Sequence, residues 1–373
     1  MPTRACPAHT YLDANATEPL RPEARAASLA ALDLAGNPAS VHGFGRAARA
    51  MLENARETIA ARFGAHPADL VFTSGGTEAN ALAISGLGAG RRLIASAIEH
   101  AAVRAAAPEA TILPVDRQGV ADLARLAALL AEGKAAFVAL MLANNETGVI
   151  QPVAEAASLC RRFGAHLHVD AVQAAGRVAC DLAALGADSL ALSGHKLGGP
   201  AGAGALLLTD AAARRLSPLI AGGGQERGRR GGTPPLPAIA GFAAAAAATG
   251  RTDLAPLLAP LRNAAEAAAI AAGAIVCGAG AARLPNTTCL ALPGVKAETQ
   301  VIALDLAGIA VSAGAACSSG KIAESHVLAA MGLGELAGQA IRVSLPWNAV
   351  EADIAAFARA YRDMATRLGR RAA

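Results

Sequence analysis

Short apolar runs alternate with alanine-rich stretches of helical periodicity through the middle of the chain, from residue 91 to about 247. Each apolar run has the length of a strand, and the stretches between them have the length of helices. Such alternation is typical of a mostly parallel sheet covered by helices on both faces. The strands predicted here are 92–96, 111–114, 136–142, 166–169, 189–192 and 203–208.

The pattern before this region predicts two helices and then a strand, a glycine turn and a third helix. The first helix follows Pro22 and runs to about Leu34, and the second covers about 45–63. The strand begins near Asp69, and the third helix has Thr77 in its first turn. Free backbone amides at such a helix start form an anion site.

A domain boundary is predicted near residue 253. Beyond it we expect strands at 274–277, 287–292, 308–312 and 341–345. The helices expected there are one directly after the boundary, one at 298–306, one capped by Ser325, and a last one from about Val350. This mixture predicts a smaller α+β domain. We therefore assign residues 13–253 to a large domain, and residues 1–12 with 254–373 to a small one.

Composition narrows the class of protein. With 373 residues, 54% hydrophobic but only 3% aromatic, the chain predicts a core of Ala, Leu, Val and Ile. No apolar run has the ~18 residues of a membrane span, and the start lacks the apolar region of a signal peptide, so we expect a cytoplasmic protein. A net charge of +4 gives no reason to expect nucleic acid, and the arginine–glycine run at 226–232 is interpreted as a loop. The six cysteines show no zinc or disulfide spacing.

Two functional side chains close neighbouring predicted strands. Asp170 follows the apolar run at 166–169, and Lys196 follows the run at 189–192 after Ser-Gly-His. Ligands of open α/β sheets bind at the carboxyl ends of strands, so we expect both side chains in one site. A lysine there can form a Schiff base with a carbonyl cofactor, and an acid can pair with a ring nitrogen. The pair predicts a pyridoxal phosphate site.

Three other kinds of site are less well supported. His166, His168 and Asp170 would share one face of a strand, but no further metal ligand lies nearby, so pairing of Asp170 with a ring nitrogen is preferred. The glycine-rich segments 86–90 and 314–322 lack the spacing of dinucleotide and nucleotide loops, which argues against NAD and ATP.

Cys317 differs from the other cysteines in its surroundings. It lies between Ser-Ala-Gly-Ala-Ala and Ser-Ser-Gly-Lys, a stretch with little to bury it, whereas Cys160, Cys180, Cys277 and Cys289 lie in or at the end of helical or apolar patterns. An accessible thiol on a loop can become a nucleophile once it loses its proton. Its context leaves two interpretations open, a nucleophile and an unreactive loop cysteine.

The chain resembles a known family. The motifs are Asp-Ala-Asn-Ala-Thr at 13–17, Gly-Asn-Pro-Ala-Ser at 36–40, Phe-Thr-Ser-Gly-Gly-Thr-Glu-Ala-Asn at 72–80, Glu-His at 99–100, Asn-Asn-Glu-Thr-Gly at 144–148, His-Val-Asp-Ala-Val-Gln at 168–173, Ser-Gly-His-Lys at 193–196, the glycine–arginine run to Thr at 222–233, and Gly-Ala-Ala-Cys-Ser-Ser-Gly at 314–320. In this order they resemble the cysteine desulfurases, in the class V branch of the pyridoxal-phosphate aminotransferase superfamily. The Ala-Cys-Ser-Ser setting is similar to the NifS/IscS-like group.

The resemblance implies a fold and a set of roles. The fold would be the type I aminotransferase fold, with a mostly parallel seven-stranded sheet. Lys196 would carry the cofactor and Asp170 would pair with its ring nitrogen. His100 would stack on the ring and move protons. Roles near the cofactor and substrate are implied for the following residues: Gln173 and Asn145 near the ring hydroxyl, Gly76, Thr77, Ser193 and His195 at the phosphate, Thr233 at the phosphate of a neighbouring subunit, and Arg342, with Asn15 and Asn145, at the substrate.

The implied reaction converts L-cysteine to L-alanine and leaves a persulfide on Cys317, on a loop of about residues 313–324. The sulfur would pass to an iron–sulfur scaffold or a thiolation protein, the chain would form a homodimer, and no resident metal is expected, although Cys317 is a candidate transient ligand of an iron–sulfur cluster. Glu18 stands where the family commonly has threonine, and Val172 where a polar residue is frequent. The alternatives are a selenocysteine lyase or another class V enzyme, and a degenerate, non-enzymatic sulfur-carrier or assembly partner.

Overall fold

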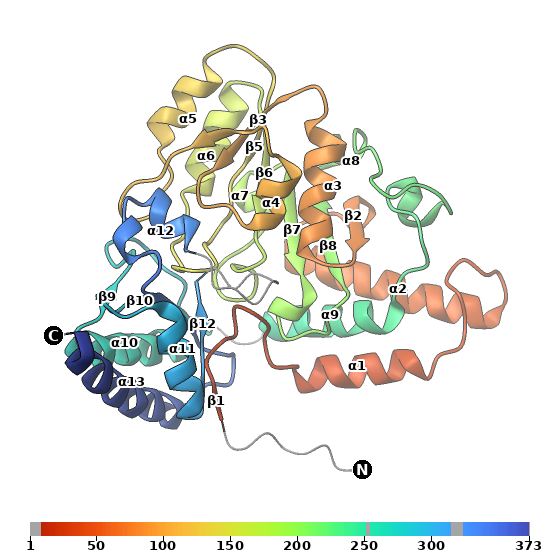
Figure 1. Cartoon of the computed structure of the whole chain (residues 1–373). Helices are drawn as coiled ribbons and strands as arrows, with labels where there is room; N and C mark the ends of the chain where they lie inside the picture. Colours follow the sequence, from red (N-terminus) through yellow and green to blue (C-terminus); the bar gives the residue numbers. More distant parts are fainter. Residues whose placement is uncertain (1–8, 251–253, 315–323, 373) are drawn as a thin grey trace.

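The computed structural model describes residues 9–250, 254–314 and 324–372 (Figure 1). Within these residues, seven strands form a large sheet in which the pairs from β7 to β4 are parallel, while β8 runs antiparallel to both of its neighbours. In their order across the sheet the strands are β2 (Leu70–Thr73), β8 (Gly204–Leu208), β7 (Ser189–Ser193), β6 (His166–Asp170), β5 (Ala136–Ala139), β3 (Arg92–Ser96) and β4 (Thr111–Leu113). The predicted, mostly parallel sheet is confirmed.

Alternate side chains of these strands enter two separate apolar clusters, because successive residues of a strand point to opposite faces. In β8, Ala205 and Leu207 pack on one face, and Leu206 and Leu208 on the other. The helices of the first face are α1 (Pro22–Leu32), α2 (Gly43–Arg62), α5 (Leu123–Leu130), α6 (Val153–Arg162), α7 (Leu182–Leu185) and α9 (Leu236–Thr249); those of the second are α3 (Gly76–Gly88), α4 (Ala101–Ala106) and α8 (Asp210–Ala213). The result is a three-layer α/β/α arrangement.

The last of the alanine-rich stretches, which ends near residue 247, forms α9. It packs against α1 and α2, and most of its residues are buried. Small side chains allow this close contact between helices, which explains how a chain with few aromatic residues fills its core.

A second, antiparallel sheet lies beside the first. It consists of β12 (Ser312–Ala313), β13 (Ala340–Ser344), β10 (Thr287–Ala291) and β9 (Ile275–Val276), while β1 (Thr10–Tyr11) pairs with β11 (Ile309–Ala310). The helices after residue 253 are α10 (Ala255–Ala271), α11 (Ala297–Leu306), α12 (His326–Ala330) and α13 (Glu351–Ala372). The boundary predicted near residue 253 falls outside the described residues, and we retain the two-domain division as a proposal.

Two predicted strands need correction. The strand expected at 308–312 is two strands, because β11 pairs with β1 while β12 pairs with β13 in the other sheet. The strand expected at 136–142 ends as β5 at Ala139, although the amides of Leu140 and Leu142 still donate to carbonyls of His168 and Asp170. Ser325 caps α12 as predicted, accepting from the amide of Leu328.

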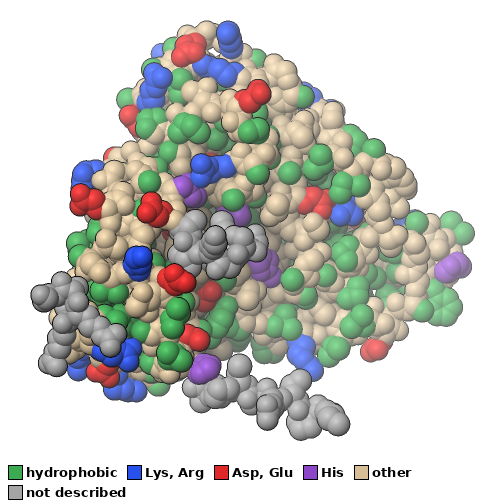
Figure 2. Space-filling view, viewed as in Figure 1, with side chains coloured by type: hydrophobic (Ala, Val, Ile, Leu, Met, Phe, Trp, Pro, Cys, Tyr) green, Lys and Arg blue, Asp and Glu red, His purple; other side chains and the backbone are tan. Residues whose placement is uncertain are grey.

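Charged side chains of both signs are interspersed over the face shown in Figure 2. Across the described residues, no helix combines the length and apolar character needed to cross a membrane. Nor do those residues contain a cluster of three or more His, Cys, Asp or Glu side chains arranged to hold a metal ion.

Candidate active site

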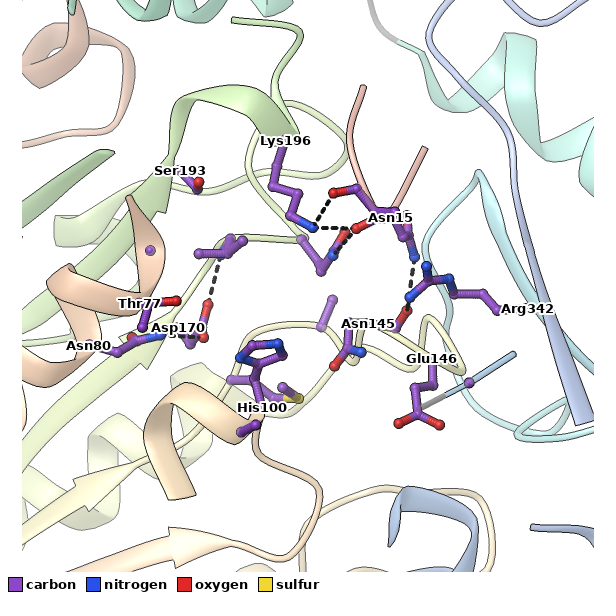
Figure 3. A pocket seen from close by; sticks show the side chains of 18 of the residues that line it. Asn15, Thr77, Asn80, His100, Asn145, Glu146, Asp170, Ser193, Lys196 and Arg342 are labelled. Atoms are coloured by element: carbon purple, nitrogen blue, oxygen red, sulfur yellow. Dashed lines mark hydrogen bonds between the residues drawn. The ribbon is translucent and has the colours of Figure 1, made fainter. Parts of the chain in front are cut away.

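A cavity of about 560 Å³ is lined by the segments that follow β5, β6 and β7 and by residues of the small sheet (Figure 3). It contains most of the residues to which the sequence assigned a role. These are Asn15, Gly76, Thr77, His100, Asn145, Asp170, Gln173, Ser193, His195, Lys196 and Arg342. The residues are far apart in the chain, and the ends of the strands bring them together.

Lys196 ends the short helical turn η2 (Gly194–Lys196), directly after β7. Its Nζ donates to the carbonyl of Ala16 at 2.9 Å and to that of Asn15. Burial, followed by the positive charges of Arg342 and Arg177, lowers the pKa of Lys196 to about 7. A neutral amine is therefore abundant at neutral pH, which is the form that attacks an aldehyde.

Asp170 is buried at the end of β6 and points into the cavity. Its Oδ1 accepts from the amide of Val172 at 2.9 Å, and its Oδ2 accepts from Nδ2 of Asn80 at 2.7 Å. The pKa of Asp170 is raised, because burial outweighs the opposing effects of the Val172 amide, His100, Asn80 and Lys196. A cationic ring nitrogen beside the carboxylate would stabilise the ionised form further.

His100 is the N-cap of α4, and its Nδ1 accepts from the amide of Ala102 at 3.1 Å. Because Nδ1 is an acceptor, a neutral ring carries its hydrogen on Nε2. Burial lowers the pKa of His100, and Asp170 opposes that effect. In Figure 3 the ring lies between Asp170 and Asn145.

The side of the cavity formed by the start of α3 and the end of β7 is suited to an anion. α3 begins at Gly76, and Ser193 and His195 line the cavity with Thr77. Gly75, the N-cap of α3, lies next to Ser193, since a Cβ on Gly75 would be 3.9 Å from the Ser193 hydroxyl oxygen. The free amides of a helix start, together with hydroxyl donors, provide a phosphate cradle. These observations fit a phosphate monoester.

Glu78, the acidic residue in the first turn of α3, does not prevent a phosphate from binding there. Both carboxylate oxygens of Glu78 accept from Arg230, at 2.8 and 3.1 Å, and one also accepts from the amide of Ser74. The Arg230 and Ser74 bonds lower the pKa of Glu78. Its charge is therefore balanced by Arg230 rather than left to repel an anion.

Arg342 enters the cavity from β13 of the small sheet. Its guanidinium donates to Asp13 Oδ1 at 2.7 Å and to the carbonyl of Asn145 at 3.2 Å, and its buried Nε has no partner among the described residues. The Asn145 carbonyl also accepts from Nδ2 of Asn15 at 3.1 Å. Each terminal nitrogen of Arg342 uses one N–H in these bonds, so N–H groups remain on both for a carboxylate in the cavity.

Gln173 and the family departure Glu18 meet through Arg177. Arg177 donates to Gln173 Oε1 at 2.6 Å and to Glu18 Oε1 at 3.1 Å, while Gln173 Nε2 donates to the carbonyl of Asn15 at 2.9 Å. Glu18 Oε2 accepts from the amide of Trp347 at 3.2 Å. Glu18 therefore forms a buried ion pair with Arg177 and does not line the cavity.

Two of the predicted site residues are not in this group. Thr233 is exposed and lies outside the cavity. Cys317 lies outside the described residues, but Gly314 and Glu324, near the two ends of the segment that contains it, both line the cavity.

Sequence reasoning missed several lining residues, including Asn80, Arg104, Glu146 and His326. Asn80 carries the clearest signal, because it lies one helical turn after Gly76 in a motif that was already identified. Glu146 is buried, and its Oε2 accepts from the Ser325 hydroxyl at 2.6 Å. Arg104 and His326 had no recognisable pattern.

Comparison with known proteins places this site in context. The sequence profile described as aminotransferase class-V matches residues 10–357. A cysteine desulfurase of Cereibacter sphaeroides is 43% identical, over 92% of this chain and 92% of that protein. An IscS-like cysteine desulfurase of Mycobacterium tuberculosis is 37% identical, over 92% of this chain and 93% of that protein. A solved NifS-like protein of Rickettsia africae superposes with a TM-score of 0.89 at 34% identity, covering 95% of this chain and 99% of that one.

Proposed function

The chain belongs to the class-V aminotransferase family, and on this premise we propose that it is a cysteine desulfurase whose cavity binds pyridoxal phosphate and L-cysteine. Near-full-length similarity to curated cysteine desulfurases supports the activity. The observation that carries the chemistry is the convergence of Lys196, Asp170 and Arg342 on one cavity. An amine, an acid and a carboxylate-binding cation are the groups that amino-acid chemistry on this cofactor requires.

The residues present fit the cofactor. Lys196 would hold its aldehyde, and Asp170 its ring nitrogen. Gly76, Thr77, Ser193 and His195 would hold its phosphate, and Gln173, whose amide has a second N–H beyond the one given to Asn15, would donate to the ring hydroxyl. When bound, pyridoxal phosphate supplies an electron sink for the negative charge that develops on the amino acid.

The side chains then bind and orient L-cysteine. Arg342 would take the substrate carboxylate with the remaining N–H groups of its terminal nitrogens, and Asn145 lies beside it. Lys196 Nζ, once neutral, would take the proton from the substrate α-carbon. His100, with its hydrogen on Nε2, would stack on the ring and exchange a proton at that atom.

We assign the acceptor of sulfur to Cys317. The thiolate attacks the sulfur of L-cysteine, an S–S bond forms, the substrate C–S bond breaks, and its β-carbon gains a proton. The balance is one enzyme thiol and one L-cysteine giving one enzyme persulfide and one L-alanine, with no external oxidant. The lining positions of Gly314 and Glu324, the described residues on either side of Cys317, support this assignment.

Partners follow from the same assignment. A persulfide must be passed to an acceptor, so we propose a sulfur-accepting protein such as an iron–sulfur scaffold or a thiolation carrier. We also propose a homodimer in which Thr233 of one copy reaches the phosphate of the other, a role that its exposed position supports. Sedimentation analysis of the purified chain tests the dimer, and a monomer at micromolar concentration would contradict it.

The decisive experiment measures alanine and persulfide formation from L-cysteine. We expect Cys317→Ala to lose persulfide formation while keeping the visible absorbance of the bound cofactor. Cys160→Ala, which alters a buried cysteine of α6 away from the cavity, is the control and should behave like the wild type. We expect Lys196→Ala to lose both persulfide formation and the visible absorbance of the bound cofactor. Full persulfide formation by Cys317→Ala would overturn the assignment of the nucleophile.

A further inference from the structure

A chain of buried polar side chains runs away from the cavity behind Asp170. Asn80 Oδ1 lies 2.9 Å from His168 Nε2, and His168 Nδ1 lies 3.0 Å from the Ser189 hydroxyl oxygen. The same oxygen lies 3.2 Å from His166 Nε2. With the 2.7 Å bond from Asn80 to Asp170, four hydrogen bonds connect the carboxylate to the far end of β6. Figure 3 shows its first link, with Asn80 reaching Asp170 from α3.

The fold holds this chain rigidly. His166, His168 and Asp170 alternate along β6 and therefore share one face, while Ser189 opposes His168 on β7. The ring of Phe137 on β5 stacks on both imidazoles, at centroid distances of 5.2 and 6.0 Å. All four linking side chains are at most 3% exposed. Water has little access to these groups, so the protein itself must satisfy them.

If Asp170 is ionised, as pairing with a cationic ring nitrogen requires, its charge fixes the direction of every bond. An ionised carboxylate only accepts, so Asn80 presents its NH₂ to Asp170 and its oxygen to His168. The oxygen also only accepts, so His168 must carry a hydrogen on Nε2. Burial lowers the pKa of His168 to about 3, so the ring is neutral and its Nδ1 accepts the Ser189 proton.

The same logic continues to the end of the chain. Ser189 has one proton, already given to His168, so its oxygen accepts from His166 Nε2. Burial also lowers the pKa of His166 to about 3, which leaves Nδ1 of that ring without hydrogen. Asp188, the acid facing it, lies 3.8 Å away and accepts from the Leu167 amide at 2.8 Å instead. Arg91 and Arg215 are the other charges acting on His166.

This chain of hydrogen bonds points its donors toward Asp170 but cannot carry a proton to it. All four bonds donate toward Asp170, and hydrogen bonds aligned in one direction polarise one another. An amide cannot pass on a proton as an imidazole or hydroxyl can, so Asn80 prevents transfer from the histidines to Asp170.

We propose that Asn80, His168, Ser189 and His166 are positioning residues that hold Asp170 as a fixed, ionised carboxylate for the cofactor ring nitrogen. The inference rests on the proposed function, because it assumes that Asp170 faces that nitrogen. It assigns a purpose to the two buried histidines that alternate with Asp170 along β6.

The test uses holoenzyme labelled with ¹⁵N-histidine. We expect nuclear magnetic resonance to find His166 and His168 neutral between pH 6 and 8, each with its hydrogen on Nε2. In Ser189→Ala the Nδ1 resonance of His168 should shift to that of an acceptor without a partner. Ser85→Ala is the control, because it removes an exposed hydroxyl that bonds only within α3. A hydrogen on Nδ1 of His168, or a charged ring, overturns the proposal.

Cofactor affinity supplies the second readout, measured by titrating cofactor-free protein with pyridoxal phosphate and without cysteine. Loss of a bond to a charged group predicts about tenfold to hundredfold weaker binding for Asn80→Ala, and a smaller loss, about threefold to tenfold, for Ser189→Ala. Unchanged cofactor affinity and unchanged histidine resonances in Ser189→Ala would refute the proposed role of the hydrogen-bond chain. Failure of the wild-type chain to bind pyridoxal phosphate would instead refute the proposed function on which it rests.

Discussion

The lowered pKa of Lys196 leads to a direct prediction about the capture of the cofactor. The ordinary pKa of a lysine is 10.5, and the fold lowers it to about 7, chiefly by burial and then by Arg342 and Arg177. At pH 7 about half of the amines would be neutral, compared with about one in three thousand for an ordinary lysine. The reactive amine is therefore about a thousandfold more abundant.

The assay follows absorbance as cofactor-free protein is mixed with pyridoxal phosphate from pH 5.5 to 9.5. The rate constant for condensation with Lys196 should rise about tenfold per pH unit below 7 and then level off, because the amine is fully neutral above that value. A free lysine derivative under the same conditions corrects for ionisation of the cofactor, and Lys196→Ala identifies reaction at other amines. A rate that continues to climb tenfold per unit up to pH 9 would refute the lowered pKa.

The same shift has a consequence for stability, whose sign follows from proton binding. Between pH 7 and 10.5 the unfolded chain binds more protons at Lys196 than the folded chain does, so stability rises with pH in that window. The cost of burying the charged amine is complete below pH 7 and amounts to about 5 kcal/mol at most. Cofactor-free Lys196→Met should therefore gain most over the wild type at pH 6–7, with the gain shrinking toward pH 10, as measured by urea unfolding.

Three further predictions concern other parts of the molecule. Glu226→Ala should destabilise the protein by about 2–4 kcal/mol in denaturant unfolding, because the buried Arg56 guanidinium keeps only the half-exposed Glu53 as an acidic partner and the Phe72 amide loses its acceptor. Arg214→Ala, which breaks an exposed ion pair, should change stability by less than about 1 kcal/mol. Arg342→Lys should raise the KM for L-cysteine about tenfold or more with a smaller effect on kcat in an alanine assay, since lysine keeps the charge but loses the planar fork; an unchanged KM would contradict the carboxylate role. Gly204→Ala should lower the free energy of unfolding by about 1–3 kcal/mol and weaken cofactor binding, because its Cβ would lie 2.6 Å from the backbone of Gly75 in the turn before α3. Thermal unfolding with and without pyridoxal phosphate measures both effects. An unchanged stability would contradict the close contact.

Much of the fold could be predicted because the signals are local. β3 spans Arg92–Ser96 as the hydrophobic pattern indicates, and the N-cap at Ser325 was recognisable from one residue and its position. Strand order, in contrast, depends on pairing between distant segments. The division of 308–312 between two sheets shows this most clearly, because a two-residue strand carries too little pattern to reveal its partner.

The sequence by itself determined which chemical groups are available and in which local setting. Lys196 and Asp170 each follow a predicted strand, and the carboxyl ends of parallel strands lie at one edge of the sheet. The identity of the cofactor and the phosphate cradle at Gly76 could therefore be proposed before the fold was known.

Only the tertiary structure decided how these groups are tuned, because electric fields and burial come from residues that are distant in the chain. The amine of Lys196 is made reactive by its burial and by Arg342 in another sheet. Glu18 belongs to an ion pair with Arg177 that no local pattern could reveal. The charge of Asp170 orders a chain of hydrogen bonds through α3, β6 and β7, since directions along such a chain exist only once all of its members are in contact.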